Sequence, residues 1–315
     1  MPAVMLVAWT LFTAAVLAAH AHPTRDHRAV DDRELERRAD RVGLPLPFEL
    51  RGAIAERGAR REGAVRAVAW GGFVIAVALG AAVHVLGRDR GDGLAGPIVF
   101  AVSMLALAAG RVIVAWRQRP ALVAGAPPAA RERGLEPADY STQAEETGAW
   151  AALGVMLIAP AVAWMTLEVV PGDSAAAGTA AIAALVGAAL ALVAWALLRG
   201  AETRIAHRPQ FAHDDVELAW DDADRSGAIR LLRRTMAAVA LVPAALLALV
   251  VLELAPAVGE LDGLERNAAF WTLVWAGALA VVCAIGPYLF LAAGRRNLNP
   301  SLRLWRGTDF GSDPR

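Results

Sequence analysis

Three ionisable residues, His84, Glu168 and Glu253, lie at comparable places in the chain, each near the far end of an apolar stretch. An imidazole and two carboxylates are suitable ligands for a divalent cation and suitable carriers of protons. If the three stretches pack around one axis, these side chains converge on such a site, and ionisable groups within membrane helices commonly have a function. The alternative interpretation is that each side chain lies at the membrane boundary, where it contacts headgroups and water.

Arg111 is the one basic residue that lies well inside an apolar stretch. Its long side chain can extend toward the nearer membrane surface at modest cost, and this is the first interpretation. The second is that Arg111 lines a cavity and contacts an anion or a carboxylate.

Two groups of histidines and acidic residues offer possible metal ligands. They are His20, His22, Asp26 and His27, and His207, His213, Asp214 and Asp215. Imidazole and carboxylate groups suit zinc, nickel or manganese. The first group lacks the i, i+4 spacing of a helical metal pair, and nothing in the sequence brings the two groups together. The metal content of the protein therefore stays undefined.

Familiar catalytic motifs are absent from the sequence. It contains no phosphate-binding Gly-x-x-x-x-Gly-Lys-Ser/Thr loop, no His-Glu-x-x-His and no Gly-x-Ser-x-Gly. All 31 basic residues are arginine, so no lysine can form a Schiff base. The single cysteine, Cys283, cannot form a disulfide within the chain or a cysteine-based metal site. We expect a protein that is not an enzyme and has no cofactor.

The elements that position these residues are apolar stretches. Hydrophobic residues make up 57% of the 315 residues, well above the share typical of soluble globular proteins. Seven stretches are each close to the roughly 20 apolar residues that a bilayer requires. They are residues 3–19, 67–87, 96–116, 149–170, 175–198, 236–256 and 270–293. The expected fold is an all-α, polytopic membrane bundle with seven transmembrane helices.

Arginines lie mostly on alternate segments between these stretches. Segments 20–66, 117–148 and 199–235 and the tail from residue 294 together hold 27 of the 31. By the positive-inside rule these segments are cytoplasmic, so the N-terminus is outside and the C-terminus inside, in a bacterial inner membrane. The alternative is that residues 1–21 are a cleaved signal peptide, because Ala19-His20-Ala21 fits a cleavage site. Cleavage would invert every later helix against the charge pattern.

The chain is thus expected to comprise four parts. Residues 1–19 form an N-terminal transmembrane helix, 20–66 a charged cytoplasmic segment, 67–293 a six-helix membrane domain and 294–315 a cytoplasmic tail. The membrane domain divides into three helical hairpins, 67–116, 149–198 and 236–293. Repeats often build a binding site at their interface, although three alanine-rich hairpins would also look alike by composition alone.

The cytoplasmic segments contain helix formers and scattered apolar residues. Residues 31–41 are charged on all sides, and Phe48, Leu50 and Ile54 lie among arginines. This segment could be an interfacial helix on the anionic inner leaflet, or a helix packed on its own loops. Residues 221–232 are expected to form a short helix before the sixth span. Within the spans, glycines such as Gly72, Gly178 and Gly187 are expected to allow close helix contact.

Two functional hypotheses follow. The first is a non-enzymatic membrane interaction or regulatory protein, with the lipid bilayer and an unidentified protein at the cytoplasmic face as its partners. The alternative is a small-solute or ion transporter with a site between the hairpins, which the recurrence of hairpins and the prolines within spans favour. A net charge of zero gives no argument for nucleic acid. A polar cavity at the membrane midplane would favour transport, whereas a solid alanine-packed core would argue against it.

Overall fold

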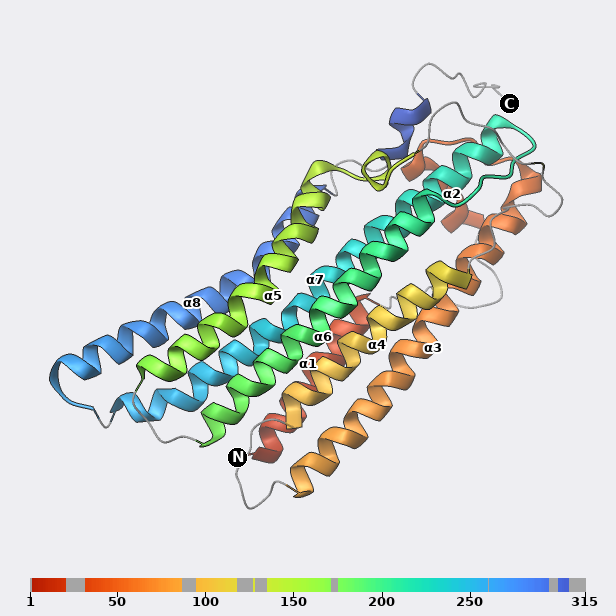
Figure 1. Cartoon of the computed structure of the whole chain (residues 1–315). Helices are drawn as coiled ribbons and strands as arrows, with labels where there is room; N and C mark the ends of the chain where they lie inside the picture. Colours follow the sequence, from red (N-terminus) through yellow and green to blue (C-terminus); the bar gives the residue numbers. More distant parts are fainter. Residues whose placement is uncertain are drawn as a thin grey trace.

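The computed structural model describes residues 2–20, 32–86, 95–117, 127, 135–170, 175–259, 261–294 and 300–305 (Figure 1). Within these ranges the chain is all-helical and contains no β-strand. The helices are α1 (Pro2–His20), α2 (Asp32–Val42), α3 (Phe48–Leu86), α4 (Ala95–Arg117), α5 (Gln143–Val169), α6 (Ala175–Ala206), α7 (Asp215–Gly259) and α8 (Gly263–Gly294). Two 3-10 helices, η1 (Pro137–Tyr140) and η2 (Pro300–Trp305), complete the described structure.

Six helices, α3 to α8, are long and apolar enough to cross a membrane. They correspond to six of the seven predicted spans, and an all-helical membrane bundle is therefore the architecture of the chain. The described part of α1 includes a shorter apolar stretch, Leu6–Ala18. The count of seven spans remains a prediction.

Helix α7 lies at the centre of the bundle (Figure 1). It packs against α4, α5, α6 and α8, and its apolar part is the most buried of the six. The second predicted hairpin does not pack as a separate unit, because α5 packs mainly on α7 and α8, and α6 packs mainly on α7. Helix α3 lies at one edge against α4, and α1 packs on α4 and α3.

Glycine permits close helix contact at two of the predicted positions. A Cβ atom at Gly72 of α3 would overlap the side chain of Ala106 on α4. A Cβ atom at Gly187 of α6 would lie 2.8 Å from a methyl group of Leu246 on α7. Small residues thus bring backbones together where lipid provides no hydrophobic drive for association. Gly178 has no atom within 4 Å of such a Cβ, so it has no such role.

Helices α3 and α7 extend far beyond their predicted spans. Helix α7 begins at Asp215, so the short helix expected at 221–232 is the first part of the same 45-residue helix that contains the sixth span. Its start is capped by Asp214, whose Oδ1 accepts the N–H of Glu217 at 2.7 Å. Helix α3 likewise begins at Phe48 rather than near residue 67. These extensions lie together at one end of the bundle (Figure 1).

We call this end the polar end: α2, residues 48–66 of α3, residues 199–206 of α6, residues 215–235 of α7, η1 and η2. It has a small apolar core of its own, made of Leu35, Ala39, Leu44, Leu50, Ile54, Ala219, Trp220 and Ala223. Leu50 and Ile54 are thus buried against α2 and α7, rather than only against the loops of their own segment. Phe48 is 83% exposed. The helix expected at 31–41 is present as α2.

Candidate functional site: a buried charge cluster on α7

The first half of α7 carries six charged residues that are almost completely buried. They are Glu217, Asp221, Asp222, Asp224, Arg225 and Arg233. A buried charge is costly unless partners neutralise it and satisfy its hydrogen bonds. We call these six residues and the side chains that bind them the α7 charge cluster.

Asp221 is fully buried and binds three arginines from three segments. Its Oδ1 atom accepts from Arg57 Nη1 of α3 at 2.9 Å and from Arg208 Nη2 at 3.1 Å. Its Oδ2 atom accepts from Arg225 Nε at 2.8 Å. Burial alone would raise the pKa of Asp221, but the charges of Arg225, Arg208 and Arg57 outweigh it and hold the pKa below its ordinary value. Asp221 is therefore an anion that joins α3, α7 and the segment after α6.

Arg208 is largely buried in the same group. Burial lowers the pKa of Arg208 to about 10, an effect that the Asp221 charge opposes and the charges of Arg225 and Arg57 strengthen. Arg208 is still protonated at neutral pH, since this pKa lies well above 7. Three cations around one carboxylate leave a local excess of positive charge, and Asp224 lies close enough to reduce it, with its Oδ2 atom 3.7 Å from Arg57.

Arg225 fixes the end of α6. Its Nη1 atom donates to the carbonyl oxygens of Ile205 at 3.1 Å, Ala206 at 3.2 Å and Arg208 at 2.7 Å. Its Nη2 atom donates to the carbonyl of Pro209 at 3.1 Å. The last carbonyls of a helix have no partner within the helix and carry partial negative charge, so a guanidinium suits this position. Arg225 therefore holds α6 and α7 in a defined register.

Asp222 is the next residue of α7 and binds three neutral donors. Tyr140 Oη donates to it at 3.1 Å, Gln210 Nε2 at 2.7 Å and Trp305 Nε1 at 3.0 Å. Ser226 Oγ adds a 2.7 Å hydrogen bond to the carbonyl of Tyr140. These contacts attach η1 and η2, which are far apart in the sequence, to the same turn of α7.

Asp224 and Trp220 attach α2. Arg38 of α2 forms an ion pair with Asp224, and its guanidinium carbon lies 5.9 Å from the centre of the Trp220 ring. Trp220 Nε1 donates to the carbonyl of Pro45 at 2.8 Å. With the apolar contacts of Leu35 and Ala39, these interactions fix the orientation of α2 on α7.

A second set of charges lies where the polar end meets the apolar part of the bundle. Glu202 of α6 accepts from Arg199 Nη1 at 2.7 Å and from Arg233 Nε at 3.1 Å. Glu146 of α5 accepts from Arg199 Nη2 at 2.7 Å and forms an ion pair with Arg233. The Arg199 guanidinium lies 5.4 Å from the centre of the Trp150 ring. Helices α5, α6 and α7 are thus joined by four charges near their entry into the apolar region.

The chemistry of the α7 charge cluster is structural. Every acidic residue in it is in contact with at least one protein side chain, through a hydrogen bond or an ion pair. Within the described residues there is no group of three or more His, Cys, Asp or Glu side chains that could hold a metal ion. The cluster fixes the positions of α2, α3, α6, η1 and η2 around α7.

The residues predicted from the sequence lie elsewhere. His84 is in the last turn of α3, Glu168 is exposed near the end of α5, and Glu253 is half-buried on α7. They are not part of any group of three or more His, Cys, Asp or Glu side chains among the described residues, and a role in proton or ion passage remains a prediction. Arg111 is 7% exposed on α4, so its side chain lies inside the bundle, where it makes at least one interaction.

Two members of the second predicted metal group, His213 and Asp214, form hydrogen bonds at the start of α7. Glu217 accepts from the backbone N–H of His213 at 2.8 Å, and its carboxylate lies 2.9 Å from His213 Nδ1. His207 Nδ1 lies 2.8 Å from the carbonyl of Thr203. In the first group, His20 is the last residue of α1. His22, Asp26 and His27 lie outside the described residues.

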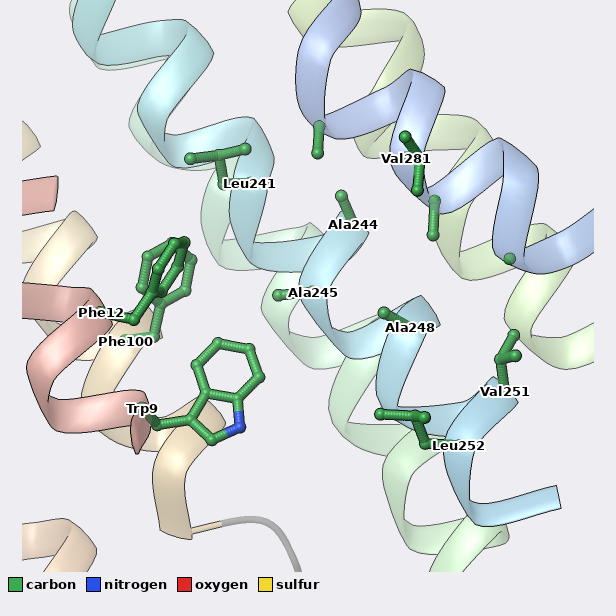
Figure 2. Close-up of a pocket in the computed structure, with 13 residues that line it drawn as sticks. Trp9, Phe12, Phe100, Leu241, Ala244, Ala245, Ala248, Val251, Leu252 and Val281 are labelled. Atoms are coloured by element: carbon green, nitrogen blue, oxygen red, sulfur yellow. The ribbon is translucent and has the colours of Figure 1, made fainter. Parts of the chain in front are cut away.

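A cavity of about 400 Å³ lies in the apolar part of the bundle, between α1 and α4 on one side and α7 and α8 on the other (Figure 2). Its lining residues are Trp9, Phe12, Phe100, Leu241, Ala244, Ala245, Ala248, Val251, Leu252, Gly277, Ala280, Val281 and Ala284. The indole nitrogen of Trp9 is the one polar atom among these side chains. Apart from this N–H group, the side chains that line the cavity are apolar.

Comparisons of the chain with protein-family models, with curated proteins and with solved structures found no match. Among the described residues, the α7 charge cluster and the apolar cavity are two features that bear on function. Of the residues named as candidates in the sequence, His213 belongs to the α7 charge cluster through its contact with Glu217, whereas His84, Glu168 and Glu253 belong to neither feature. Asp221 and Arg225 could have been found from their i, i+4 spacing within a charged helical segment, but that spacing alone also describes an exposed ion pair.

Proposed function

We propose that the chain is a non-enzymatic interaction or regulatory protein of a bacterial inner membrane, with a rigid cytoplasmic platform as its working surface. The observation that carries this proposal is that the buried charges of α7 are all used to hold the polar end together. A preassembled surface loses little conformational entropy when a partner binds, and this favours affinity.

The exposed face of α2 is the best candidate for the contact surface. Its inner side is fixed on α7 through Leu35, Arg38 and Ala39. Its outer side presents exposed charged residues of both signs, namely Arg33, Glu36, Arg37, Asp40 and Arg41. A helix held from one side and charged on the other suits recognition of a protein whose surface has complementary charges.

The proposed topology has seven spans, with the N-terminus outside and the C-terminus in the cytoplasm. Helix α1 has 19 residues and packs along α4 within the bundle, which supports counting it as a span. Described arginines of α2, of residues 48–66 of α3 and of residues 215–235 of α7 lie at the polar end, and by the positive-inside rule they favour a cytoplasmic location for that end.

Polar side chains in the apolar part of the bundle argue against the transport alternative. Thr13, Ser103 and Thr166 are buried, and each hydroxyl donates to a carbonyl one turn earlier in its own helix, at 2.6 to 2.7 Å. Hydroxyls used in this way are less available to a solute. Together with the apolar lining of the cavity, this supports interaction rather than transport.

Site-specific photo-crosslinking in intact cells tests the proposal. A photoreactive amino acid at Arg37 or Asp40 of α2 should give one discrete crosslinked protein, identified by mass spectrometry. The matched control is Leu264, which is 86% exposed at the other end of the bundle and should not capture that protein. Purified protein in liposomes should show no ion or proton flux above empty liposomes. Flux that depends on His84, Glu168 or Glu253 would instead establish the transport alternative.

Topology is tested by labelling single introduced cysteines, in a chain whose native Cys283 is replaced by alanine. Asp40→Cys should be labelled only after the membrane is permeabilised, whereas Leu264→Cys should be labelled from outside. Labelling of Asp40→Cys in intact spheroplasts would contradict a cytoplasmic polar end.

A further inference from the structure

We infer that the apolar cavity between α1, α4, α7 and α8 is a binding site for one acyl chain of a bilayer phospholipid. The inference rests on the membrane location proposed above, but not on the partner surface at α2. It assigns a ligand to a part of the molecule that the polar end does not reach.

One wall of the cavity is an aromatic cluster from two helices. Trp9 and Phe12 of α1 and Phe100 of α4 lie with ring centres 5.6 to 6.0 Å apart. These distances are typical of favourable aromatic pairs. Figure 2 shows the three rings on the side of the cavity opposite α7. The cluster is therefore a preformed wall, fixed by contacts among its own members.

The facing wall is formed by a stripe of α7 that includes Leu241, Ala245, Ala248 and Leu252. These residues lie on one face of the helix because they are three or four positions apart. The two alanines in the middle leave space that the leucines at either end enclose. Small residues of α8, Gly277 and Ala280, extend this space toward the next helix.

The chemistry of the lining selects hydrocarbon. An empty apolar cavity is unfavourable because its lining atoms lose dispersion contacts. Water does not compensate, since apolar cavities lack the two to four polar partners that an ordered water needs. The lining has no charged side chain, and its only polar side-chain atom is the Trp9 indole nitrogen. An unbranched acyl chain can make dispersion contacts with this lining and needs no polar partner.

The cavity opens toward the surroundings of the bundle. Phe12, Leu252 and Val281 line it and are 49%, 60% and 57% exposed. In a bilayer these side chains contact acyl chains, so one chain can enter sideways without breaking a polar contact. Because residues of four helices line the cavity, an acyl chain bound there contacts more protein atoms than an acyl chain on the outer faces of the bundle does.

Photo-crosslinking with lipid tests this inference on the full-length protein. The protein is reconstituted in nanodiscs that contain phosphatidylglycerol with a diazirine in its acyl chain, and adducts are mapped by mass spectrometry. Adducts should concentrate on Trp9, Phe12 and the α7 stripe. The internal reference is the outer face of α6, where Ile182 and Val186 are 58% and 55% exposed.

The variant Ala248→Phe fills the cavity and should lower its adducts about tenfold, a loss of about 1.4 kcal/mol of binding free energy. Adducts on α6 should not change. Val186→Phe, which adds the same ring on the outer face, should leave the cavity adducts intact. If Ala248→Phe does not fold, Ala245→Leu provides a smaller filling of the same space.

Three results would overturn the inference. They are equal adduct density on the cavity and on α6, cavity adducts that persist in a folded filling variant, and, with a photoreactive amino acid at Phe12 or Leu252, capture of a second copy of the chain in place of lipid. None of these results changes the outcome of crosslinking at α2, so the failure of this inference and the failure of the proposed function are separate observations.

Discussion

The two halves of α7 are both buried, but by different kinds of contact. Residues 215–235 are covered by ion pairs and hydrogen bonds, with Asp221 and Arg225 at their centre. Residues 236–259 are covered by apolar side chains of α4, α5, α6 and α8, many of them alanine. A single continuous helix therefore passes from a polar environment into an apolar one without a break.

The difference shows which contacts define geometry. A hydrogen bond to a carboxylate depends on distance and angle, so three arginines on Asp221 determine where three segments lie. Apolar contacts are not directional, and helices packed through small residues can leave a gap. Accordingly, most residues in the first half of α7 are buried by protein contacts, whereas the second half borders the cavity in Figure 2.

The largest expected effect is that of removing the central charge. Asp221→Asn should lower the free energy of unfolding by about 3 to 5 kcal/mol, because it leaves buried arginines without their carboxylate. The loss of stability is measured by thermal unfolding in detergent, with proteolysis of the polar end as the readout. The control is Glu56→Gln, whose carboxylate is 64% exposed and pairs with Arg60 at 2.8 Å. That exposed pair should contribute less than about 1 kcal/mol, and equal losses in the two variants would contradict the central role of Asp221.

Acid should weaken the polar end before the apolar half. Because folding lowers the pKa of Asp221, its contribution to stability is fully present above the unfolded value of about 3.9. The contribution is lost as the pH falls through the lower, folded value. Proteolysis at residues 215–235 should therefore increase below about pH 4, while α8 stays protected. Asp221→Asn should lack this part of the pH dependence, and an unchanged pH profile in that variant would assign the acid sensitivity to other groups.

The spans could be predicted because a bilayer demands long apolar runs. Residues 96–116 were expected to span and lie within α4, Ala95–Arg117. The buried first half of α7 could not be predicted in the same way. Asp221, Asp222 and Asp224 give this stretch a charged pattern, so no apolar face of the helix marks it as buried. Their burial depends on partners such as Arg57, 164 positions away in the sequence.

The proposed convergence of His84, Glu168 and Glu253 rested on equivalent positions in three hairpins. Equivalent positions meet only when the hairpins pack as equivalent units. Here α3 packs mainly on α4, whereas α5 packs mainly on α7 and α8. The small residues that decide these contacts, such as Gly187 and Gly148, look the same in sequence as glycines without a close neighbour. The sequence alone therefore does not determine which helices pack against one another.

In the apolar half, added volume at a close contact should destabilise more than the same volume at an open position. Gly187→Leu places a side chain against Leu246 and should cost about 1 to 3 kcal/mol of unfolding free energy. Gly178→Leu, on the same helix with no neighbour within 4 Å, should be neutral or slightly stabilising because leucine favours helix more than glycine does. Thermal unfolding in one detergent compares the two, and equal shifts would mean that the contact between α6 and α7 is not tight.

The smallest effect is expected for a neutral contact of the charge cluster. Trp305→Phe keeps an aromatic ring in η2 but removes the indole N–H that donates to Asp222 Oδ2 at 3.0 Å. Asp222 still accepts from Tyr140 and Gln210, so the loss should be about 1 kcal/mol. Trp271→Phe, at a residue 57% exposed on α8, provides the control and should change stability by less than about 0.5 kcal/mol. If Trp305→Phe lowers the free energy of unfolding as much as Asp221→Asn does, neutral hydrogen bonds stabilise the polar end as strongly as ion pairs do. Asp222, rather than Asp221, would then be the central residue of the charge cluster.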